Sequence, residues 1–231
     1  MVTRDEFLNN LSVIRARIER ACEASGRDAG TVELLPVTKN HPAEAVRLAA
    51  GAGLAGVGEN RVQEALEKRA GFDGGRFWEL IGHLQSNKVK DAVAVFDRIQ
   101  SVDSIKLLRR IDRLCGEAGK KLPVLLQCNT GEDPRKHGFR SADAAEALVL
   151  ALELRNLRLD GLMTIAPLDE DADSARAAFR ALRVLRDELQ ERHGCALPVL
   201  SMGMTGDLDA AIAEGSTQIR IGTALYGSRD G

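Results

Sequence analysis

The sequence has few of the features on which small secreted, metal-bound or membrane proteins depend. Its four cysteines lie far apart, with no CxxC pair and no His/Cys cluster, so their spacing predicts neither a disulfide framework nor a zinc site. No apolar run reaches the roughly 18 residues of a membrane-spanning helix, and the first residues are polar and acidic where a signal peptide is basic and then apolar. We therefore expect no metal, no membrane association and a cytoplasmic location.

Net charge and aromatic side chains are also scarce. Thirty-two basic and thirty-four acidic side chains leave a formal net charge of −2, and aromatic residues make up only 3% of the chain. The chain therefore has no overall electrostatic attraction to nucleic acid and little aromatic surface on which bases could stack. We expect no nucleic-acid partner.

What the sequence does contain is a regular alternation of strand-like and helix-like segments. Thr3 and Glu6 have the spacing of a capping box, and apolar residues at helical spacing follow until Ser25 and Gly26, which predicts a leading helix within residues 1–26. The segment 32–231 then alternates short apolar runs with helical stretches. The predicted strands are 32–37, 54–57, 77–81, 98–102, 122–128, 159–165, 197–200 and 218–221. The predicted helices include 43–50, 62–69, 105–115, 142–154, 175–193 and 208–213.

Strict alternation of this kind is typical of right-handed βαβ units and a parallel sheet. The 231 residues suffice for eight such units in one domain, 1–231. We predict an α/β fold, a single (β/α)8 TIM barrel with an additional N-terminal helix. An open doubly wound sheet is the alternative, but the first predicted strand lacks the Gly-rich turn of a dinucleotide-binding fold.

The active site of such a barrel lies at the C-terminal ends of its strands, which places Lys39 in the barrel mouth. A lysine held there can lose its proton more readily and attack an aldehyde to form a Schiff base. The alternative is an ordinary surface lysine.

Two glycine-rich turns with hydroxyl side chains follow the last two predicted strands. Strands 7 and 8 commonly supply the phosphate pocket of this fold. Residues of the types required there are Ser201, Gly203, Thr205, Gly206, Gly222 and Thr223. Tight loop geometry alone is the alternative explanation for these glycines.

Other polar residues at strand ends permit more than one interpretation each. Glu59 and Asn60 could belong to the site at the strand ends or simply cap the following helix, and His83 could hold a loop, cap the next helix or act in acid–base chemistry. The basic segment 133–138 could be a solvated loop or a lid over an anion.

Several motifs together resemble the pyridoxal phosphate homeostasis protein family, whose members look like the barrel domain of alanine racemase standing alone. The resemblance runs over almost the whole chain. Its motifs are Val37-Thr38-Lys39, Gly58-Glu59-Asn60-Arg61-Val62-Gln63-Glu64, Ile81-Gly82-His83-Leu84-Gln85-Ser86-Asn87-Lys88, Ser101-Val102-Asp103, Gly161-Leu162-Met163, Leu200-Ser201-Met202-Gly203-Met204 and Ile219-Arg220-Ile221-Gly222-Thr223. Three positions depart from the usual pattern: Thr38 and Thr205, where the family often has serine, and His137, where it often has Ser.

The resemblance implies a set of cofactor-binding residues. Lys39 would carry pyridoxal 5′-phosphate (PLP) as a Schiff base, and Asn60 and His83 would line the ring pocket. Ser201, Gly222 and Thr223 would hold the phosphate, with Met202 and Gly203 in the same strand-end motif. Arg220 would face the pyridine nitrogen and disfavour its protonation, which makes PLP a weaker electron sink.

The function implied is PLP (vitamin B6) homeostasis, by buffering or delivering PLP, as a monomer and with PLP-dependent apoenzymes as partners. The alternative is a PLP-dependent amino-acid racemase, and whether the protein is an enzyme at all is left open. Racemisation resembles two-base chemistry with a tyrosine from a second domain. The sequence shows no such domain, and its one tyrosine, Tyr226, lies where packing is expected. We expect no robust catalysis; a barrel enzyme acting on a sugar phosphate is a further alternative.

Overall fold

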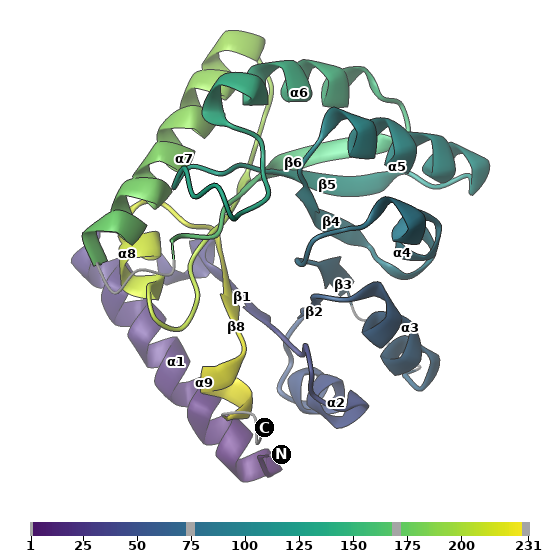
Figure 1. Ribbon diagram of the computed structural model, residues 1–231. Helices are drawn as coiled ribbons and strands as arrows, with labels where there is room; N and C mark the ends of the chain where they lie inside the picture. Colours follow the sequence, from purple (N-terminus) through teal and green to yellow (C-terminus); the bar gives the residue numbers. More distant parts are fainter. Residues whose placement is uncertain (1, 73–76, 168–171, 228–231) are drawn as a thin grey trace.

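The computed structural model describes residues 2–72, 77–167 and 172–227, and within them eight parallel strands form a barrel with helices around it (Figure 1). This confirms the predicted (β/α)8 fold. The strands are β1 (Glu33–Pro36), β2 (Gly56–Glu59), β3 (Phe77–Leu80), β4 (Arg98–Val102), β5 (Leu122–Gln127), β6 (Leu157–Met163), β7 (Val199–Ser201) and β8 (Gln218–Ile221). Residues 1 and 228–231, at the ends of the predicted spans, lie outside the described residues.

The helices complete the alternation predicted from the sequence. They are α1 (Arg4–Ala24), α2 (Ala43–Gly51), α3 (Val62–Ala70), α4 (Val89–Val95), α5 (Ile105–Glu117), α6 (Ser141–Glu153), α7 (Ala172–His193), α8 (Leu208–Ala213) and α9 (Thr223–Tyr226), with 3-10 turns η1 (Ala29–Thr31) and η2 (Ser86–Lys88). Helices α4 and α9, of seven and four residues, were not among those predicted.

The sheet is nearly closed. Its strand order is β1-β8-β7-β6-β5-β4-β3-β2, and β1 pairs with β8 in parallel register from Glu33 with Gln218 to Pro36 with Ile221. Strands β1 and β2 meet beyond the end of β1, where Val37 and Gly58 form a bridge and the Thr38 N–H donates to the Gly58 carbonyl at 3.0 Å. Because all the strands are parallel, their C-terminal ends share one rim.

Helix α1 begins with the predicted capping box. The Thr3 hydroxyl accepts a hydrogen bond from the Glu6 N–H at 3.3 Å, and the Glu6 carboxylate accepts one from the Thr3 N–H at 2.7 Å. The apolar face of the helix is buried through Phe7, Leu11 and Ile14. It packs against α8 and α9, on the side of the barrel where β8 returns to β1 (Figure 1).

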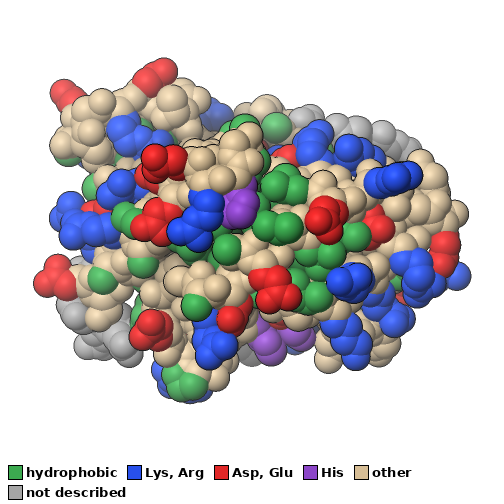
Figure 2. Space-filling model, turned by 90° about the horizontal axis from the view of Figure 1, so that it is seen from above, with side chains coloured by type: hydrophobic (Ala, Val, Ile, Leu, Met, Phe, Trp, Pro, Cys, Tyr) green, Lys and Arg blue, Asp and Glu red, His purple; other side chains and the backbone are tan. Residues whose placement is uncertain are grey.

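The outer surface carries mixed charges with some exposed apolar side chains. Figure 2 shows the face formed by α6 and α7, where hydrophobic side chains gather in the middle and charged ones surround them. Among the exposed large hydrophobic residues, Val149 and Leu152 lie on α6 and Val184 on α7. Among the described residues, no helix combines the length and apolarity needed to cross a membrane.

Candidate cofactor site

A cavity of about 500 Å³ opens at the rim formed by the C-terminal strand ends. Its described lining contains basic residues and two histidines but no carboxylate, so the cavity favours an anionic ligand. The lining residues are Val37, Lys39, Asn60, Ile81, Gly82, His83, Gln127, Arg135, Lys136, His137, Ile165, Met204, Thr205, Arg220, Gly222 and Thr223.

Lys39 enters this cavity from a backbone that is held on both sides. Just before it, Thr38 is completely buried; its hydroxyl donates to Glu59 Oε1, and its carbonyl accepts a hydrogen bond from Lys68 Nζ at 2.7 Å. Just after it, Asn40 has a φ of 58° and donates its N–H to Glu64 Oε2 at 2.8 Å. The position of the Lys39 backbone is therefore determined by neighbouring elements.

Glu59 is not the helix cap that was one of its two interpretations. It is completely buried, and Lys68 Nζ lies 2.6 Å from its Oε1, so the two side chains form a buried ion pair. Burial raises the pKa of the Glu59 carboxyl, and the hydrogen bonds from Lys68 and Thr38 oppose that rise. Helix α3 begins beyond it, at Val62.

Asn60 and His83, predicted to line a cofactor's ring pocket, both line this cavity. The ends of β2 and β3 approach each other closely beside them, since a Cβ on Gly82 would lie 2.3 Å from the Asn60 carbonyl oxygen. Only a glycine at position 82 permits this approach.

Arg220 contributes a buried cation to the cavity. Its side chain is fixed by two hydrogen bonds, from Nη1 to Ser201 Oγ at 2.7 Å and from Nη2 to the Thr164 carbonyl at 2.8 Å. Burial lowers the pKa of Arg220 to about 10, and the negative charges of Asp207 and Glu79 oppose this shift. The guanidinium therefore remains charged at neutral pH.

A chain of buried polar side chains supports Arg220 from inside the barrel. Ser201 Oγ donates to Gln100 Oε1 at 2.6 Å, and Gln100 Nε2 donates to Glu79 Oε2 at 2.6 Å. Burial raises the pKa of Glu79, whereas Arg98 at 3.2 Å lowers it. Because Ser201 already accepts from Arg220 and donates to Gln100, its hydroxyl is committed to this interior network.

The predicted residues at the ends of β7 and β8 divide into two groups. Gly222 and Thr223 line the cavity, but Ser201, Met202 and Gly203 are not among its lining residues. Ser201 and Met202 are completely buried. The turn after β7 requires a glycine at position 203, because the φ there is +96° and a Cβ would lie 2.5 Å from the Ala211 Cβ. Met204 and Thr205 line the cavity in their place, so the hydroxyl residue that the turn after β7 contributes to the cavity is Thr205.

The basic segment 133–138 forms part of the cavity wall. Gln127 Nε2 donates to the His137 carbonyl at 2.9 Å, Asn129 Nδ2 donates to the Asp133 carbonyl at 2.8 Å, and Lys136 Nζ donates to the Ala166 carbonyl. Arg135 to His137 consequently face the ligand space. The sequence had left the role of this segment open between a solvated loop and a lid.

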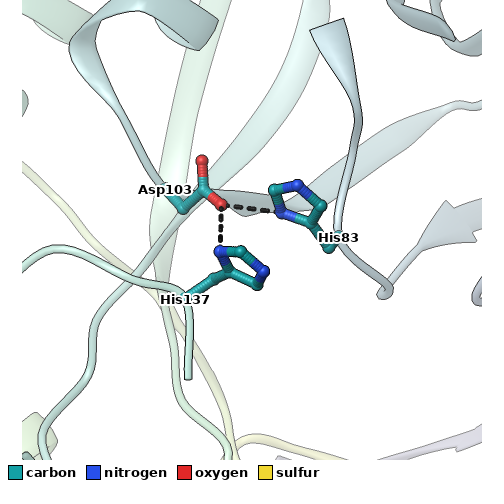
Figure 3. Close-up of side chains that lie close together, drawn as sticks. All are labelled: His83, Asp103 and His137. Atoms are coloured by element: carbon teal, nitrogen blue, oxygen red, sulfur yellow. Dashed lines mark hydrogen bonds and ion pairs between the residues drawn. The ribbon is translucent and has the colours of Figure 1, made fainter. Parts of the chain in front are cut away.

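The loop also brings together three residues that the sequence did not connect. His83 Nδ1 lies 2.9 Å and His137 Nδ1 3.7 Å from Asp103 Oδ2, and the two imidazole rings stack with their centroids 3.8 Å apart (Figure 3). The three come from different strand ends, so no local spacing in the sequence could reveal the cluster.

Comparison with known proteins first defines the class. A family model described as "Alanine racemase, N-terminal domain" matches residues 9–230. Alanine racemase from Clostridium difficile 630 superposes with a TM-score of 0.78 over 98% of this chain and 58% of that chain, at 16% identity, which shows a common fold alone. The protein is thus an alanine-racemase-type barrel.

Two relatives of higher identity define the family. A protein of Aquifex aeolicus (strain VF5) named pyridoxal phosphate homeostasis protein is 41% identical over 220 residues, covering 95% of this chain and 96% of the relative. The structure of PipY from Synechococcus elongatus PCC7942 with PLP bound superposes with a TM-score of 0.80 at 41% identity, covering 91% of this chain and 99% of that chain. The chain belongs to the pyridoxal phosphate homeostasis protein family, which confirms the resemblance seen in its motifs.

Proposed function

We propose that this protein binds PLP through a Schiff base on Lys39 and acts in PLP homeostasis by holding and releasing the cofactor. The observation that carries the proposal is the convergence of Lys39 and Arg220 on one basic cavity of about 500 Å³. An amine suits the aldehyde of PLP, and the basic lining suits its phosphate. The PLP bound in the PipY relative supports the same assignment.

The residues present fit the group, and each has a distinct role. Thr205, Gly222 and Thr223 hold the phosphate at the ends of β7 and β8, while Asn60 and His83 form the wall beside the ring. Ser201, for which the motif implied a phosphate contact, instead holds Arg220 in place. Met202 and Gly203 shape the turn that presents Met204 and Thr205.

Arg220 faces the pyridine nitrogen in this proposal, and it disfavours catalysis. PLP, when bound, supplies an electron sink that is strong only if its ring nitrogen is protonated. A guanidinium that stays charged at neutral pH and is locked by Ser201 and Thr164 opposes a proton at that nitrogen. We therefore propose a carrier without robust turnover.

Tyr226 supports the same conclusion, because it is not available as a second base. Its side chain is 2% exposed, its hydroxyl donates to the Ala45 carbonyl at 3.1 Å, and its ring packs against Phe7 and His41. Burial raises its pKa well above the ordinary range. The racemase alternative would need another group on the second face of the substrate.

The experiment that tests the site is the absorption spectrum of the purified chain with PLP, followed by borohydride reduction and peptide mapping. We expect a visible band and PLP fixed to Lys39. Lys39→Ala should abolish the fixed label, whereas Lys136→Ala, which removes another lysine of the same cavity, should retain it. A borohydride-stable label of normal yield in Lys39→Ala would overturn the assignment.

Incubation with L- and D-amino acids separates carrier from racemase. Interconversion at ordinary enzyme rates would support the racemase, and its absence in a PLP-loaded chain supports the carrier. If no chromophore forms at all, the sugar-phosphate enzyme with a Lys39 Schiff base becomes the hypothesis to test.

We propose further that the protein acts in the cytoplasm. Its free cysteines, Cys22, Cys115, Cys128 and Cys195, support a reducing compartment. We also propose that it is a single-domain monomer that passes PLP to apoenzymes. Light scattering of the loaded chain tests the monomer. Activation of a PLP-dependent apoenzyme, with and without a scavenger of free PLP, tests direct transfer.

A further inference from the structure

We infer that His83, Asp103 and His137 form a binding site for a divalent transition-metal ion at the mouth of the cavity. One nitrogen from each imidazole and one carboxylate oxygen lie within 4.8 Å of one another. Figure 3 shows both rings directing Nδ1 toward the same Asp103 oxygen. The sequence predicted no metal, because these residues are far apart in the chain and form no recognisable motif.

The distances match a shared ion. Metal–ligand bonds of about 2.0–2.1 Å at angles between 90° and 110° place neighbouring ligand atoms roughly 2.9–3.4 Å apart. The observed Nδ1–Oδ2 separations are 2.9 Å for His83 and 3.7 Å for His137. The second separation is too long for a hydrogen bond, and it exceeds the range for ligands of a shared ion by a few tenths of an ångström. The exposed His137 side chain would move toward the ion on binding.

The fold brings the three ligands together. His83 follows β3, Asp103 follows β4, and His137 lies in the loop after β5, so three consecutive parallel strands deliver them to one rim. The loop is tied down by the hydrogen bond from Gln127 Nε2 to the His137 carbonyl. The Asp103 side chain is 10% exposed, while His83 and His137 are 41% and 59% exposed, which leaves a path for an ion and its water ligands.

The two imidazole rings lie side by side at the cavity mouth, with centroids 3.8 Å apart. Both therefore offer a nitrogen to the space beside the same Asp103 oxygen, where one divalent ion could bind all three side chains.

The ligand types select the class of metal. Two imidazoles and one carboxylate suit Zn²⁺, Co²⁺ or Ni²⁺, whereas Mg²⁺ and Ca²⁺ prefer oxygen ligands alone. Three protein ligands leave coordination positions open to water or to an anion in the cavity. Lys39 and Arg220 line the same cavity and repel a cation, so we expect moderate affinity.

The test uses the full-length chain without a histidine tag and without PLP, titrated with Zn²⁺ by calorimetry and with Co²⁺ by visible absorption. We expect one ion per chain, the ligand-field bands of Co²⁺ bound to nitrogen, and no displacement by excess Mg²⁺. His137→Ser and Asp103→Asn should each weaken Zn²⁺ binding by at least about tenfold. His193→Gln, which removes a histidine far along the chain, should bind as the wild type does.

Several results would overturn the inference: no saturable Zn²⁺ binding, equal affinity in His137→Ser, or displacement by Mg²⁺ at similar concentration. Because His137 is largely exposed in a loop, its replacement leaves the fold intact, which circular dichroism checks. Imidazole NMR gives a second readout, since Zn²⁺ should shift His83 and His137 while leaving His41 and His193 unchanged. PLP binding is measured separately, so the failure of either proposal leaves the other testable.

Discussion

Arg220 Nη1 donates a hydrogen bond of 2.7 Å to Ser201 Oγ, which joins the last residue of β7 to the middle of β8 inside the barrel. The same serine donates to Gln100 at 2.6 Å. Ser201 thus connects the cation at the cavity to the buried network around Glu79. A residue whose motif suggested a ligand contact acts instead by positioning another residue.

Replacing Ser201 should therefore affect both stability and PLP binding. Ser201→Ala leaves a donor of Arg220 and an acceptor of Gln100 without their partner, so we expect a loss of about 1–3 kcal/mol in the free energy of unfolding, measured by urea denaturation. PLP should dissociate faster because Arg220 is less constrained.

Thr205→Ala is the matched control, since Thr205 lines the cavity at the end of the same strand. We expect it to weaken PLP binding while the urea midpoint stays unchanged. The reverse result, with Ser201→Ala stable and Thr205→Ala without effect on PLP, would restore Ser201 as the phosphate ligand.

Gly82→Ala should disturb the cavity itself. The new Cβ would lie 2.3 Å from the Asn60 carbonyl oxygen, so β2 and β3 must move apart where Asn60 and His83 line the site. We expect a drop of at least about tenfold in PLP affinity, since a displacement of about 1 Å in a positioned site can cost even more, and a lower melting temperature.

Gly206→Ala provides the comparison, because no atom lies within 4 Å of a Cβ added there. That variant should melt and bind PLP as the wild type does. Unchanged PLP affinity in Gly82→Ala would show that the approach of the two strand ends is not required for the site.

The sequence predicted the barrel well because its strands are buried and largely apolar and most of its helices show helical periodicity. Strands β4 and β8 and helix α8 have the bounds expected of them. Lys39, Asn60, His83 and Arg220 lie at strand ends and line the cavity on the rim where active sites of this fold occur. Their role in binding a cofactor stays a prediction.

What the sequence did not predict depends on contacts between distant segments. Strand β7 has only three residues, too few for an alternating pattern to show whether Ser201 faces inward. The cavity wall made by Arg135 to His137 rests on hydrogen bonds such as that from Gln127 to the His137 carbonyl. The cluster of His83, Asp103 and His137 likewise exists only once the ends of β3 and β4 and the loop after β5 have assembled.

Lys68 and Glu59 offer a test of how the Lys39 backbone is held. Lys68→Met would leave the buried Glu59 carboxylate without its cation and Thr38 without one of its donors. We expect a loss of about 3–5 kcal/mol in the free energy of unfolding, measured by urea denaturation, because an uncompensated buried charge is strongly unfavourable.

Two further variants show whether that loss comes from the buried charge. Glu67→Gln, at an exposed position next to Lys68 on α3, should change stability by less than about 0.5 kcal/mol. The double variant Glu59→Gln/Lys68→Met should recover part of the loss, since no charge then remains buried. If Lys68→Met were as stable as the wild type, the pair would contribute nothing to the rim.

Glu214 gives the fold an acid-sensitive contact. It is 3% exposed and lies 2.8 Å from Arg176 and 3.1 Å from Arg180 of α7. Burial alone would raise its pKa, but the hydrogen bonds and charges of the two arginines outweigh burial and lower it. Because the folded-state pKa lies below the unfolded value, the contact stabilises fully above the unfolded pKa, and its contribution declines as pH falls through the folded one.

Glu214→Gln should therefore be less stable than the wild type at neutral pH, by about 1.5 kcal/mol, the low end for charged hydrogen bonds because both arginines are half exposed. Urea denaturation at several pH values should show this difference shrinking below about pH 4.3, the ordinary pKa of glutamate. Asp209→Asn serves as control, since Asp209 pairs with Arg17 at the exposed surface. A Glu214→Gln deficit that stayed constant down to acid pH would mean that lost packing, not lost charge, destabilises the variant.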